Sequence, residues 1–521
     1  MSTNPDYANV HIETSLPRPW EDETTFNDVL YDWMSRAPWL AISAAAHVVI
    51  FLILMAIPWG LLYSGSTKEI SASIEQTPDE VFEDPEEEEP EEIEEEPIEE
   101  PILKDAEISD HEETEDEQDY ESTLGDDMLA DSPFDDKAFN DVIGIGGGAG
   151  GKFGNRFGGR RNLKRAGGSG TEQALKDGLE WLKHHQSSDG SWDTDDFMVN
   201  CGKIGSTICD GGGDANHDVG MTGLALLSFL GDGNTTRDGP YKDSVARGIK
   251  WLKEQQDPDN GLLGDRIGHS FIYNHAIATL AMCEAYYFSK SPLIKRTAQD
   301  AVNFITRARN PYSAWRYDAP PTGDNDTSVT GWMVFALKSA EESGLQVDKE
   351  SFVGAMSWFD EVTEPATGRA GYDSVGSLSS RIDGINDHYP PESGEAMTAV
   401  TLLCRFFMGQ DPDKDPIMVK HADLMLQKLP EWDPDGLQND MYYWYYGSYA
   451  MFQFGKDRYW GAWNKALKKA VLDSQRHDGD EKGSWDPKDP WGYAGGRVYS
   501  TATMVLCLEV YFRYAQVLGA R

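Results

Sequence analysis

The chain has 521 residues and a formal net charge of −45 at pH 7. A protein this acidic repels the phosphate backbone, which argues against nucleic acid as a partner. Most of the excess negative charge lies in a single block in the N-terminal third, so the chain has to be considered segment by segment.

Residues 39–64 form one apolar stretch that is long enough to cross a bilayer as a helix. The segment 1–38 before it is largely polar and no small-residue cleavage signature follows, so we expect an uncleaved anchor rather than a signal peptide. Arg18 and Arg36 precede the stretch and Lys68 follows it. This charge bias favours a cytoplasmic N-terminus, a single pass through the inner membrane and a periplasmic C-terminal domain.

Ser43 and His47 lie one helical turn apart inside this stretch and therefore share a face. Ionisable groups are costly in a bilayer and are candidates for function. The alternative is that Ser43 donates to a backbone carbonyl and that His47 packs in a helix oligomer. A Ser-x-x-x-His face followed by a Glu/Pro-rich segment resembles the anchor of TonB-type energy transducers. The resemblance implies that His47, with Ser43 beside it, couples to an ExbB/ExbD-like proton-driven motor. The usual C-terminal domain of those transducers is absent.

The segment 65–142 is predicted to be a disordered acidic tether. From residue 79 to residue 100, fifteen of 22 residues are acidic, and prolines interrupt the run. Such a composition cannot bury enough apolar surface to offset chain entropy, and its charges repel one another. The segment 143–170 is instead glycine-rich and basic, which is typical of a flexible linker; a contact with anionic lipid or with the acidic block is the alternative.

Residues 171–521 repeat one pattern six times: a first helix, a turn, and a second, more apolar helix. A helix that is apolar on every side must be buried, so the pattern predicts an all-α, closed (α/α)6 toroid with amphipathic helices outside and apolar helices inside. The first helices are expected at 172–186, 242–256, 295–309, 349–362, 416–429 and 461–476. The second helices align without gaps on one polar position, occupied by Thr222, His275, Thr330, Thr398, Tyr446 and Thr501.

The turn after the first of these helices reads Gln186-x-x-Asp-Gly-Ser-Trp192, and weaker versions of it end at Trp315 and Trp485. This motif resembles the QW-type motif of the squalene cyclase and prenyltransferase repeat family. The segments 323–332 and 442–446 resemble a bacterial, membrane-anchored branch of that family. The resemblance covers 171–521 and implies the toroid fold, in which the Gln and Trp side chains brace neighbouring repeats. It implies less about chemistry, because one fold serves many functions.

Cyclases of that family protonate an alkene with the middle acid of a DxDD motif, held in a dry cavity that raises its pKa. The sequence Asp324-Asn-Asp326-Thr lies where the family places this acid, at the start of the third inner helix, but lacks the final Asp. Asp326 is equally suited to capping that helix, as is Asp218 in the first inner helix. Asp193-Thr-Asp-Asp has the DxDD letters but follows the turn on the outer rim, where we expect a solvated cap.

The aligned polar side chains are expected near the open end of a central cavity. Aromatic residues close to them would give the cavity a wall suited to an apolar lipid or isoprenoid, although core packing is the alternative for such side chains. The charge of Arg497 is expected to face Asp218 and Asp326. The expected cavity residues are Asp218, Thr222, Tyr273, His275, Thr330, Trp332, Thr398, Trp444, Tyr446, Arg497 and Thr501.

Cys201 and Cys209 flank a short loop and can form a disulfide if the domain is exported. No cysteine and histidine have zinc-ligand spacing in the sequence, and His275 and Cys283 lie two helical turns apart. No metal or other cofactor is therefore expected.

These features together predict a membrane-anchored, exported toroid that acts as a binding or scaffold module for a ligand or a protein. The alternative is a terpene cyclase-like or prenyltransferase-like enzyme that acts on an isoprenoid or lipid in the cavity. The anchor and the long tether favour the first hypothesis, because a stand-alone enzyme working on membrane lipid needs no such reach.

Overall fold

The structure is a computed structural model that describes residues 163, 167–202, 207–379 and 384–514. The predicted N-terminal segment, the span with Ser43 and His47, and the acidic tether lie outside these residues. Among the described helices, none combines the length and the apolar character needed to cross a membrane.

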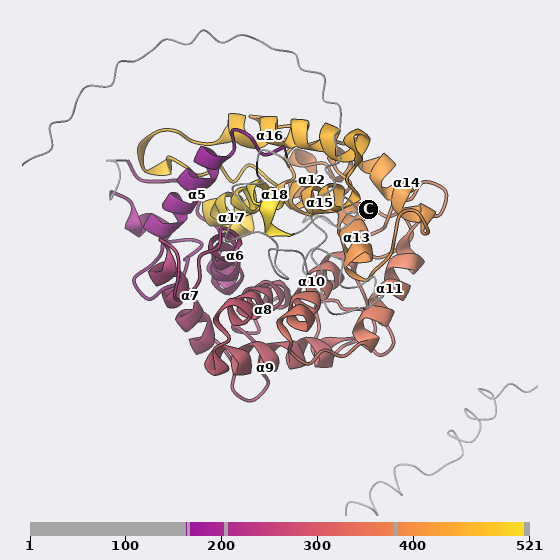
Figure 1. The fold of residues 1–521 in the computed structure, drawn as a ribbon, viewed down its shortest axis with the longest axis horizontal. Helices are drawn as coiled ribbons and strands as arrows, with labels where there is room; N and C mark the ends of the chain where they lie inside the picture. Colours follow the sequence, from indigo (N-terminus) through magenta and orange to yellow (C-terminus); the bar gives the residue numbers. More distant parts are fainter. Residues whose placement is uncertain (1–162, 164–166, 203–206, 380–383, 515–521) are drawn as a thin grey trace, which may run out of the picture. The chain divides into compact units, whose positions relative to one another are not determined.

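The described helices form two concentric rings (Figure 1). The outer ring consists of α5 (Glu172–His184), α7 (Lys242–Glu254), α9 (Pro292–Ala308), α11 (Glu350–Val362), α14 (Pro416–Met425) and α16 (Ala462–Ser474). The inner ring consists of α6 (Asp218–Gly231), α8 (Ser270–Ser289), α10 (Thr327–Ser343), α13 (Ala396–Phe407), α15 (Met441–Phe454) and α17 (Gly492–Leu508). Each inner helix packs on the next, and α17 packs on α6, so the ring closes. The predicted all-α toroid is confirmed.

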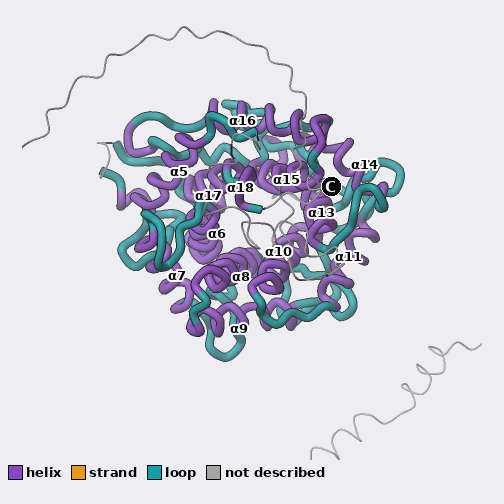
Figure 2. Tube along the Cα trace, in the orientation of Figure 1, coloured by secondary structure: helices purple, strands orange, loops and turns teal. Residues whose placement is uncertain are grey.

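The connections between these helices are loops with short helical turns, and the described residues include no β-strand (Figure 2). Three isolated bridges, such as Gln475 with Trp485, tighten the turns that follow outer helices. The short helical elements are η2 (Phe197–Asn200), η3 (Ala215–His217), α12 (Ile385–His388), η4 (Pro391–Ser393), η5 (Lys456–Gly461), η6 (Gly479–Glu481) and α18 (Val510–Arg513).

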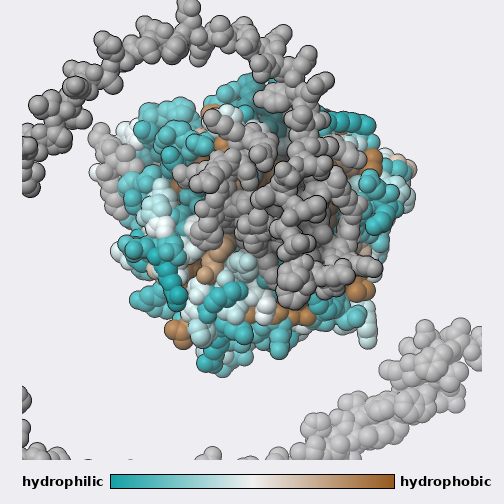
Figure 3. Space-filling model, in the orientation of Figure 1, coloured by the Kyte–Doolittle hydropathy of each residue, from teal (hydrophilic) through white to brown (hydrophobic). Residues whose placement is uncertain are grey.

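The two rings differ in composition because they differ in surroundings. The outer helix α5 buries Leu175, Leu179 and Leu182 on one face and carries charged residues on the other. In the inner helix α10, every residue except Glu341 is buried, which follows from an apolar surface on all sides. The outward surface of the toroid is correspondingly hydrophilic over much of the coloured part of Figure 3.

A glutamine at the end of an outer helix ties each of three turns to the following outer helix. The Gln186 side-chain amide donates to the carbonyls of Gly190 at 2.9 Å, in its own turn, and of Ser244 at 3.0 Å, in α7. Gln256 donates in the same way to Gly261 at 3.2 Å and to Thr297 at 2.9 Å, in α9. The turns are thereby fixed to the neighbouring repeat.

Gln475 makes the equivalent contact where the last repeat meets the first. Its amide donates to the Gly483 carbonyl at 3.0 Å and to the Ala174 carbonyl, in α5, at 2.8 Å. The toroid is therefore closed by the same hydrogen bonds that join consecutive repeats. Helix α5 also packs closely on α17, since a side chain at Gly178 would run into Val505.

Tryptophans in the turns of the first, third and sixth repeats are fully buried and close each turn onto its own outer helix. Their indole N–H groups donate to main-chain carbonyls of that helix: Trp192 to Leu182 at 2.7 Å, Trp315 to Ile305 at 2.8 Å, and Trp485 to Val471 at 2.8 Å. A buried tryptophan needs a partner for this group, and the helix end supplies an otherwise unpaired carbonyl.

The end of the predicted basic linker packs on the last outer helix. Leu163 is buried, and α16 donates side-chain hydrogen bonds from Asn464 to the Gly167 carbonyl at 3.1 Å and from Lys468 to the Ser169 carbonyl at 2.8 Å. The described residues 163 and 167–170 therefore contact the toroid ahead of the expected boundary at 171.

A buried ion cluster joins the C-terminal ends of three inner helices. Arg513, in α18, donates to Glu284 of α8 at 3.0 Å, to Glu509 at 2.7 Å and to the Leu227 carbonyl of α6 at 2.7 Å. All three charged side chains are fully buried. Gly231 is needed here, because a side chain at this position would overlap Glu509 and Arg513.

We predict that Gln475→Ala weakens ring closure. It leaves two buried carbonyls without their donor, at a cost of about 1–3 kcal/mol in the free energy of unfolding. Chemical denaturation of the variant measures this loss. The matched control is Gln427→Ala, because Gln427 is exposed and makes only a long hydrogen bond within its own helix region. Equal effects of the two substitutions would contradict the bracing role.

Replacing Arg513 by Leu should cost about 3–5 kcal/mol, because it leaves two buried carboxylates without their cation. Adding Glu284→Leu to that variant should recover part of the loss, since one of the uncompensated charges is removed as well. The denaturation midpoints of the single and the double variant measure this difference in stability. A double variant that is less stable than the single one would show that the pair matters through packing.

Candidate functional site

The inner ring encloses a cavity of about 570 Å³ at the N-terminal ends of its helices. Its size falls within the range of about 300–1,000 Å³ found for small-molecule sites. Its deeper wall is apolar and aromatic, and its mouth is polar. The wall includes Met221, Leu224, Tyr273, Ile277, Trp332, Met397, Tyr442, Tyr445, Tyr499 and Thr503, and the mouth includes Asp214, His217, His269, Arg316, Tyr317, Tyr372 and Tyr493.

Trp332 is the centre of the aromatic wall. Its ring lies 5.8 Å from that of Tyr445 at an interplanar angle of 19°, and 6.4 Å from that of Tyr442. The Tyr442 hydroxyl lies 3.2 Å from the Ser328 hydroxyl, which connects α15 to α10 across the cavity rim. Such an arrangement offers a bound molecule flat, polarizable surfaces.

Two tyrosines of the wall have hydroxyl groups with no hydrogen-bond partner within the described residues, namely Tyr445 and Tyr499. Burial raises the pKa of both hydroxyls well above the ordinary value of 10.0, so they remain neutral donors at physiological pH. A buried hydroxyl without a partner is costly. A ligand group that accepts a hydrogen bond would remove this cost.

The mouth of the cavity is held by stacked and charged groups from loops. The His269 ring stacks on Tyr317 at 4.4 Å and 2°, and the hydroxyls of Tyr317 and Tyr372 contact each other. The Arg316 guanidinium lies over both tyrosine rings and 3.8 Å from Asp373. The mouth therefore carries a cation framed by aromatic rings.

Asp326 caps α10 and does not line the cavity. Its Oδ1 accepts from the Val329 N–H at 2.7 Å, whereas its buried Oδ2 has no hydrogen-bond partner within the described residues. Burial raises the pKa of Asp326 from 3.8 to about 7, against the opposing effects of the Val329 hydrogen bond and the Arg316 charge. Asp324 is exposed, so the two acids of the expected motif lie in different surroundings.

Most side chains at the aligned polar position face away from the cavity. The sequence-based expectation that they line the cavity is therefore wrong for these residues. Thr222, Thr330, Thr398 and Thr501 are buried, and their hydroxyls accept hydrogen bonds from the backbone N–H groups of the turns that follow the outer helices. These donors are Trp192 at 2.9 Å, Trp315 at 3.3 Å, Ala370 at 3.2 Å and Trp485 at 3.4 Å. The position therefore anchors turns to inner helices.

His275 performs the same task with its ring. Its Nδ1 accepts from the Leu263 N–H at 3.0 Å, and its Nε2–H donates to the Ala301 carbonyl at 3.1 Å. Burial lowers its pKa to about 3, so the imidazole is neutral. His275 is therefore a structural residue outside the cavity.

The cavity is lined instead by residues two positions away along the same helices. Leu224, Ile277, Trp332 and Thr503 each lie two residues after the aligned position, and Tyr273, Ser328 and Tyr499 lie two residues before it. Two residues of an α-helix correspond to a rotation of about 200°. When one side chain faces the outer ring, the side chains two residues before and after it therefore face the axis of the toroid.

The remaining expected cavity residues also lie elsewhere. Trp444 and Tyr446 are buried outside the cavity lining, with Tyr446 packed edge-on against Trp332. Asp218 accepts from the backbone and hydroxyl of Thr194 at 2.8 and 2.6 Å and thus fixes a turn. Arg497 does not face Asp218 or Asp326; it is fully buried and pairs with Asp486 at 2.8 Å and with Asp210. Tyr273 and Trp332 line the cavity as expected.

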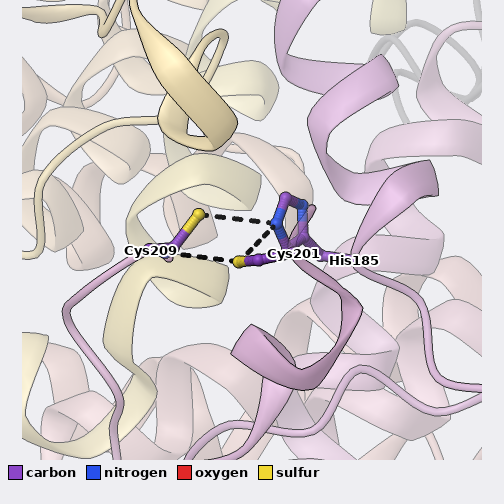
Figure 4. Close-up of side chains that lie close together, drawn as sticks. All are labelled: His185, Cys201 and Cys209. Atoms are coloured by element: carbon purple, nitrogen blue, oxygen red, sulfur yellow. Dashed lines mark hydrogen bonds between the residues drawn. The ribbon is translucent and has the colours of Figure 1, made fainter. Parts of the chain in front are cut away.

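Outside the cavity, the structure brings together three side chains that the sequence separates. Cys201 and Cys209 are free thiols, and each sulfur lies 3.5 Å from Nε2 of His185 (Figure 4). Burial raises the pKa of Cys209 to about 12. The Asp193 carboxylate of the DxDD-like sequence accepts from the N–H groups of Asp195 and Asp196 at 3.2 and 2.6 Å, so it stabilises a turn rather than the helix cap predicted from the sequence.

No known family profile matches the chain. Among curated proteins, it is similar to a squalene–hopene cyclase from Bradyrhizobium diazoefficiens, with 27% identity over 202 residues. The similar stretch covers 35% of this chain and 28% of the cyclase, so the chain spans less than a third of that relative's length.

Solved structures with a similar arrangement include a type II terpene cyclase from Scytonema, with a TM-score of 0.41 and 14% identity over 68% of this chain and 98% of that one. An α-1,6-mannanase from Salegentibacter has a TM-score of 0.43 and 13% identity, over 65% of this chain and 98% of the mannanase. A cellobiose 2-epimerase from Spirochaeta thermophila has a TM-score of 0.45 and 13% identity, over 68% of this chain and 96% of the epimerase. At these scores and identities, nothing about the activity of this chain follows.

Proposed function

We propose that the toroid is a binding module for an apolar molecule with a hydrogen-bond-accepting end, of the lipid or isoprenoid class. The observation that carries the proposal is the aromatic cavity around Trp332, whose lining includes Tyr445 and Tyr499, two tyrosines with buried hydroxyls that have no hydrogen-bond partner within the described residues. Apolar walls supply affinity through burial, and a few polar groups fix the orientation. The anchor at 39–64, its location in the inner membrane, and its coupling through Ser43 and His47 to a motor stay predictions.

The first experiment is native mass spectrometry of the full-length protein purified from its own membrane extract. A stoichiometric apolar adduct is the expected result. A protein that carries no adduct, and takes up none from added geranylgeraniol, would overturn the proposal and leave the surface of the toroid as the binding element.

Filling the cavity should abolish the adduct. Thr503 lies on the cavity wall, and Thr503→Phe places a ring in the empty volume while the polar anchors of the turns are left intact. Tyr499→Phe should weaken binding by about fivefold, through loss of one hydrogen bond of about 1 kcal/mol. Both are measured by titrating geranylgeraniol in native mass spectrometry.

The matched control is Tyr446→Phe. Its hydroxyl is also buried and has no hydrogen-bond partner within the described residues, but Tyr446 does not line the cavity. This variant should bind like the parent protein. A loss of affinity in Tyr446→Phe equal to that in Tyr499→Phe would show that the effect comes from packing rather than from the cavity.

The second candidate function is a terpene cyclase-like reaction with Asp326 as the acid. Two observations favour considering it: the pKa of about 7, which keeps part of the Asp326 population protonated at neutral pH, and the buried Oδ2. The similarity to a squalene–hopene cyclase agrees with this direction. Against it stand the cap contact with Val329, the position of Asp326 behind the cavity wall, and Thr327 in place of the final acid of the motif.

The pH dependence of stability tests the state of Asp326. Because its folded pKa of about 7 exceeds the ordinary 3.8, the folded state binds more protons, so stability should fall as pH rises from about 4 to about 7. Asp326→Asn should remove this fall, because Asn still accepts from Val329 but carries no charge. Asp326→Ala should be about 1 kcal/mol less stable than Asp326→Asn, through loss of the cap. Thermal melts across this pH range measure both effects.

Incubation of the same variants with squalene separates a cap from a catalytic acid. A cyclised product that forms with the parent protein and disappears in the stable Asp326→Asn variant would favour the enzyme. No product from the parent protein, together with the expected stability changes, would support the cap.

A further inference from the structure

His185, Cys201 and Cys209 come from three neighbouring segments of the first repeat. His185 follows α5 directly, Cys201 ends the turn η2, and Cys209 lies on the far side of the loop that precedes α6. Their three ligand atoms lie within 4.8 Å of one another, and each of the two sulfurs lies 3.5 Å from the same imidazole nitrogen (Figure 4). His185 and Cys209 are almost fully buried, and Cys201 is partly exposed.

The histidine ring is fixed in the orientation that a metal ligand needs. Its Nδ1 lies 2.8 Å from the Trp181 carbonyl, to which it donates, so the lone pair of Nε2 points toward the two sulfurs. The ring also stacks on the Trp181 indole at 4.1 Å and meets the edge of Phe197 at 5.8 Å. A backbone carbonyl that holds the second ring nitrogen is the usual support of a metal-bound histidine.

The two nitrogen–sulfur distances match those of tetrahedral coordination. With Zn–S bonds of about 2.3 Å, a Zn–N bond of about 2.05 Å and tetrahedral angles, a bound nitrogen and sulfur lie about 3.6 Å apart. The two nitrogen–sulfur distances of 3.5 Å meet this value without any rearrangement. The backbone N–H of Cys209 also donates to the Cys201 sulfur at 3.2 Å, which would stabilise that sulfur as a thiolate.

We propose that His185, Cys201 and Cys209 bind one Zn²⁺ ion, with a water molecule or another small ligand at the fourth position on the exposed side of Cys201. Two thiolates and one imidazole are ligands that zinc prefers. Binding releases the two thiol protons to solvent, and the resulting centre of one Zn²⁺ and two thiolates carries no net charge, which suits a largely buried site. The sequence expectation that no metal is bound would then be wrong.

The position of the cluster suggests a structural role at the seam between the last and the first repeat. The Trp181 indole N–H donates to the Asp480 carbonyl at 3.0 Å, and the Thr207 hydroxyl accepts from the Asp480 N–H at 3.0 Å. Asp210, next to Cys209, pairs with Arg497 of α17. A metal held by Cys201 and Cys209 would fix the loop that makes these contacts.

The main competitor is the disulfide between Cys201 and Cys209. In a disulfide the two sulfurs are bonded to each other, whereas Cys201 and Cys209 are free cysteines in the structure. The metal site instead uses the nitrogen and both sulfurs together. The arrangement of the three side chains therefore favours the metal.

The test is the metal content of the full-length protein, purified without a histidine tag and without chelators, by inductively coupled plasma mass spectrometry. We expect about one zinc per chain in the parent protein, and a loss of at least tenfold in Cys209→Ala, Cys201→Ala and His185→Ala. The matched control is Cys404→Ala, which removes a fully buried thiol from an inner helix and should retain the zinc. Replacing zinc by Co²⁺ should give a thiolate-to-cobalt charge-transfer band in the parent and control proteins.

A metal-free parent protein that also takes up no Co²⁺ would overturn the proposal. If peptide mapping of that protein shows Cys201 linked to Cys209, the pair is a disulfide; if thiol titration finds both free, the cluster is a hydrogen-bonded group of core residues. Zinc that remains in Cys209→Ala but disappears in Cys404→Ala would place the metal elsewhere. A fall in melting temperature on chelation of the parent protein, absent in Cys209→Ala, would support the role at the seam.

Discussion

The toroid depends on a set of hydrogen bonds between its turns and its inner helices. In five repeats, the backbone N–H at the end of a turn donates to the side chain of one buried polar residue, such as Thr222 or His275. Without this acceptor, each turn would bury an unpaired N–H group against an apolar helix. The glutamine contacts to the next outer helix act on three of these turns, so that the position of a turn within its repeat and its attachment to the next repeat are set together there.

This arrangement also determines which side chains can line the cavity. Because the aligned polar side chain is committed to the outer ring in five of the six inner helices, the opposite face of these helices is free to carry large aromatic groups. Trp332, Tyr445 and Tyr499 lie on that face, and their rings fill the wall where the helices converge. The polar groups at the mouth, such as Arg316 and Tyr317, come mainly from loops. The deeper wall of the cavity is therefore apolar and its mouth polar, because the two are built from different parts of each repeat.

The sequence predicted the number and order of the helices of the two rings and the approximate bounds of the outer ones, because amphipathic helices and fully apolar helices have clearly different sequence patterns. It did not predict which way the aligned position faces. A gapless alignment fixes a residue along the helix, whereas the rotation of Thr330 toward the Trp315 turn depends on contacts between helices. Tyr317 and Tyr372 reach the cavity from loops, whose sequences lack the hydrophobic periodicity that identifies a helix face. His185 meets Cys209 across 24 residues, a separation outside the spacings of local metal motifs, so no pattern indicated the cluster.

Ring closure has a consequence for the order in which the chain can fold. The contact of Gln475 with Ala174 spans 301 residues, and α5 completes its packing on α17 of the last repeat. During synthesis at 5–20 residues per second, the apolar face of α5 would wait roughly 15–60 s for this partner. Long-range contacts of this kind slow folding and leave hydrophobic surface accessible in the meantime. The first repeat is thus the first to be synthesised and among the last to be completed, and it is the segment for which a chaperone in the compartment of folding would matter most.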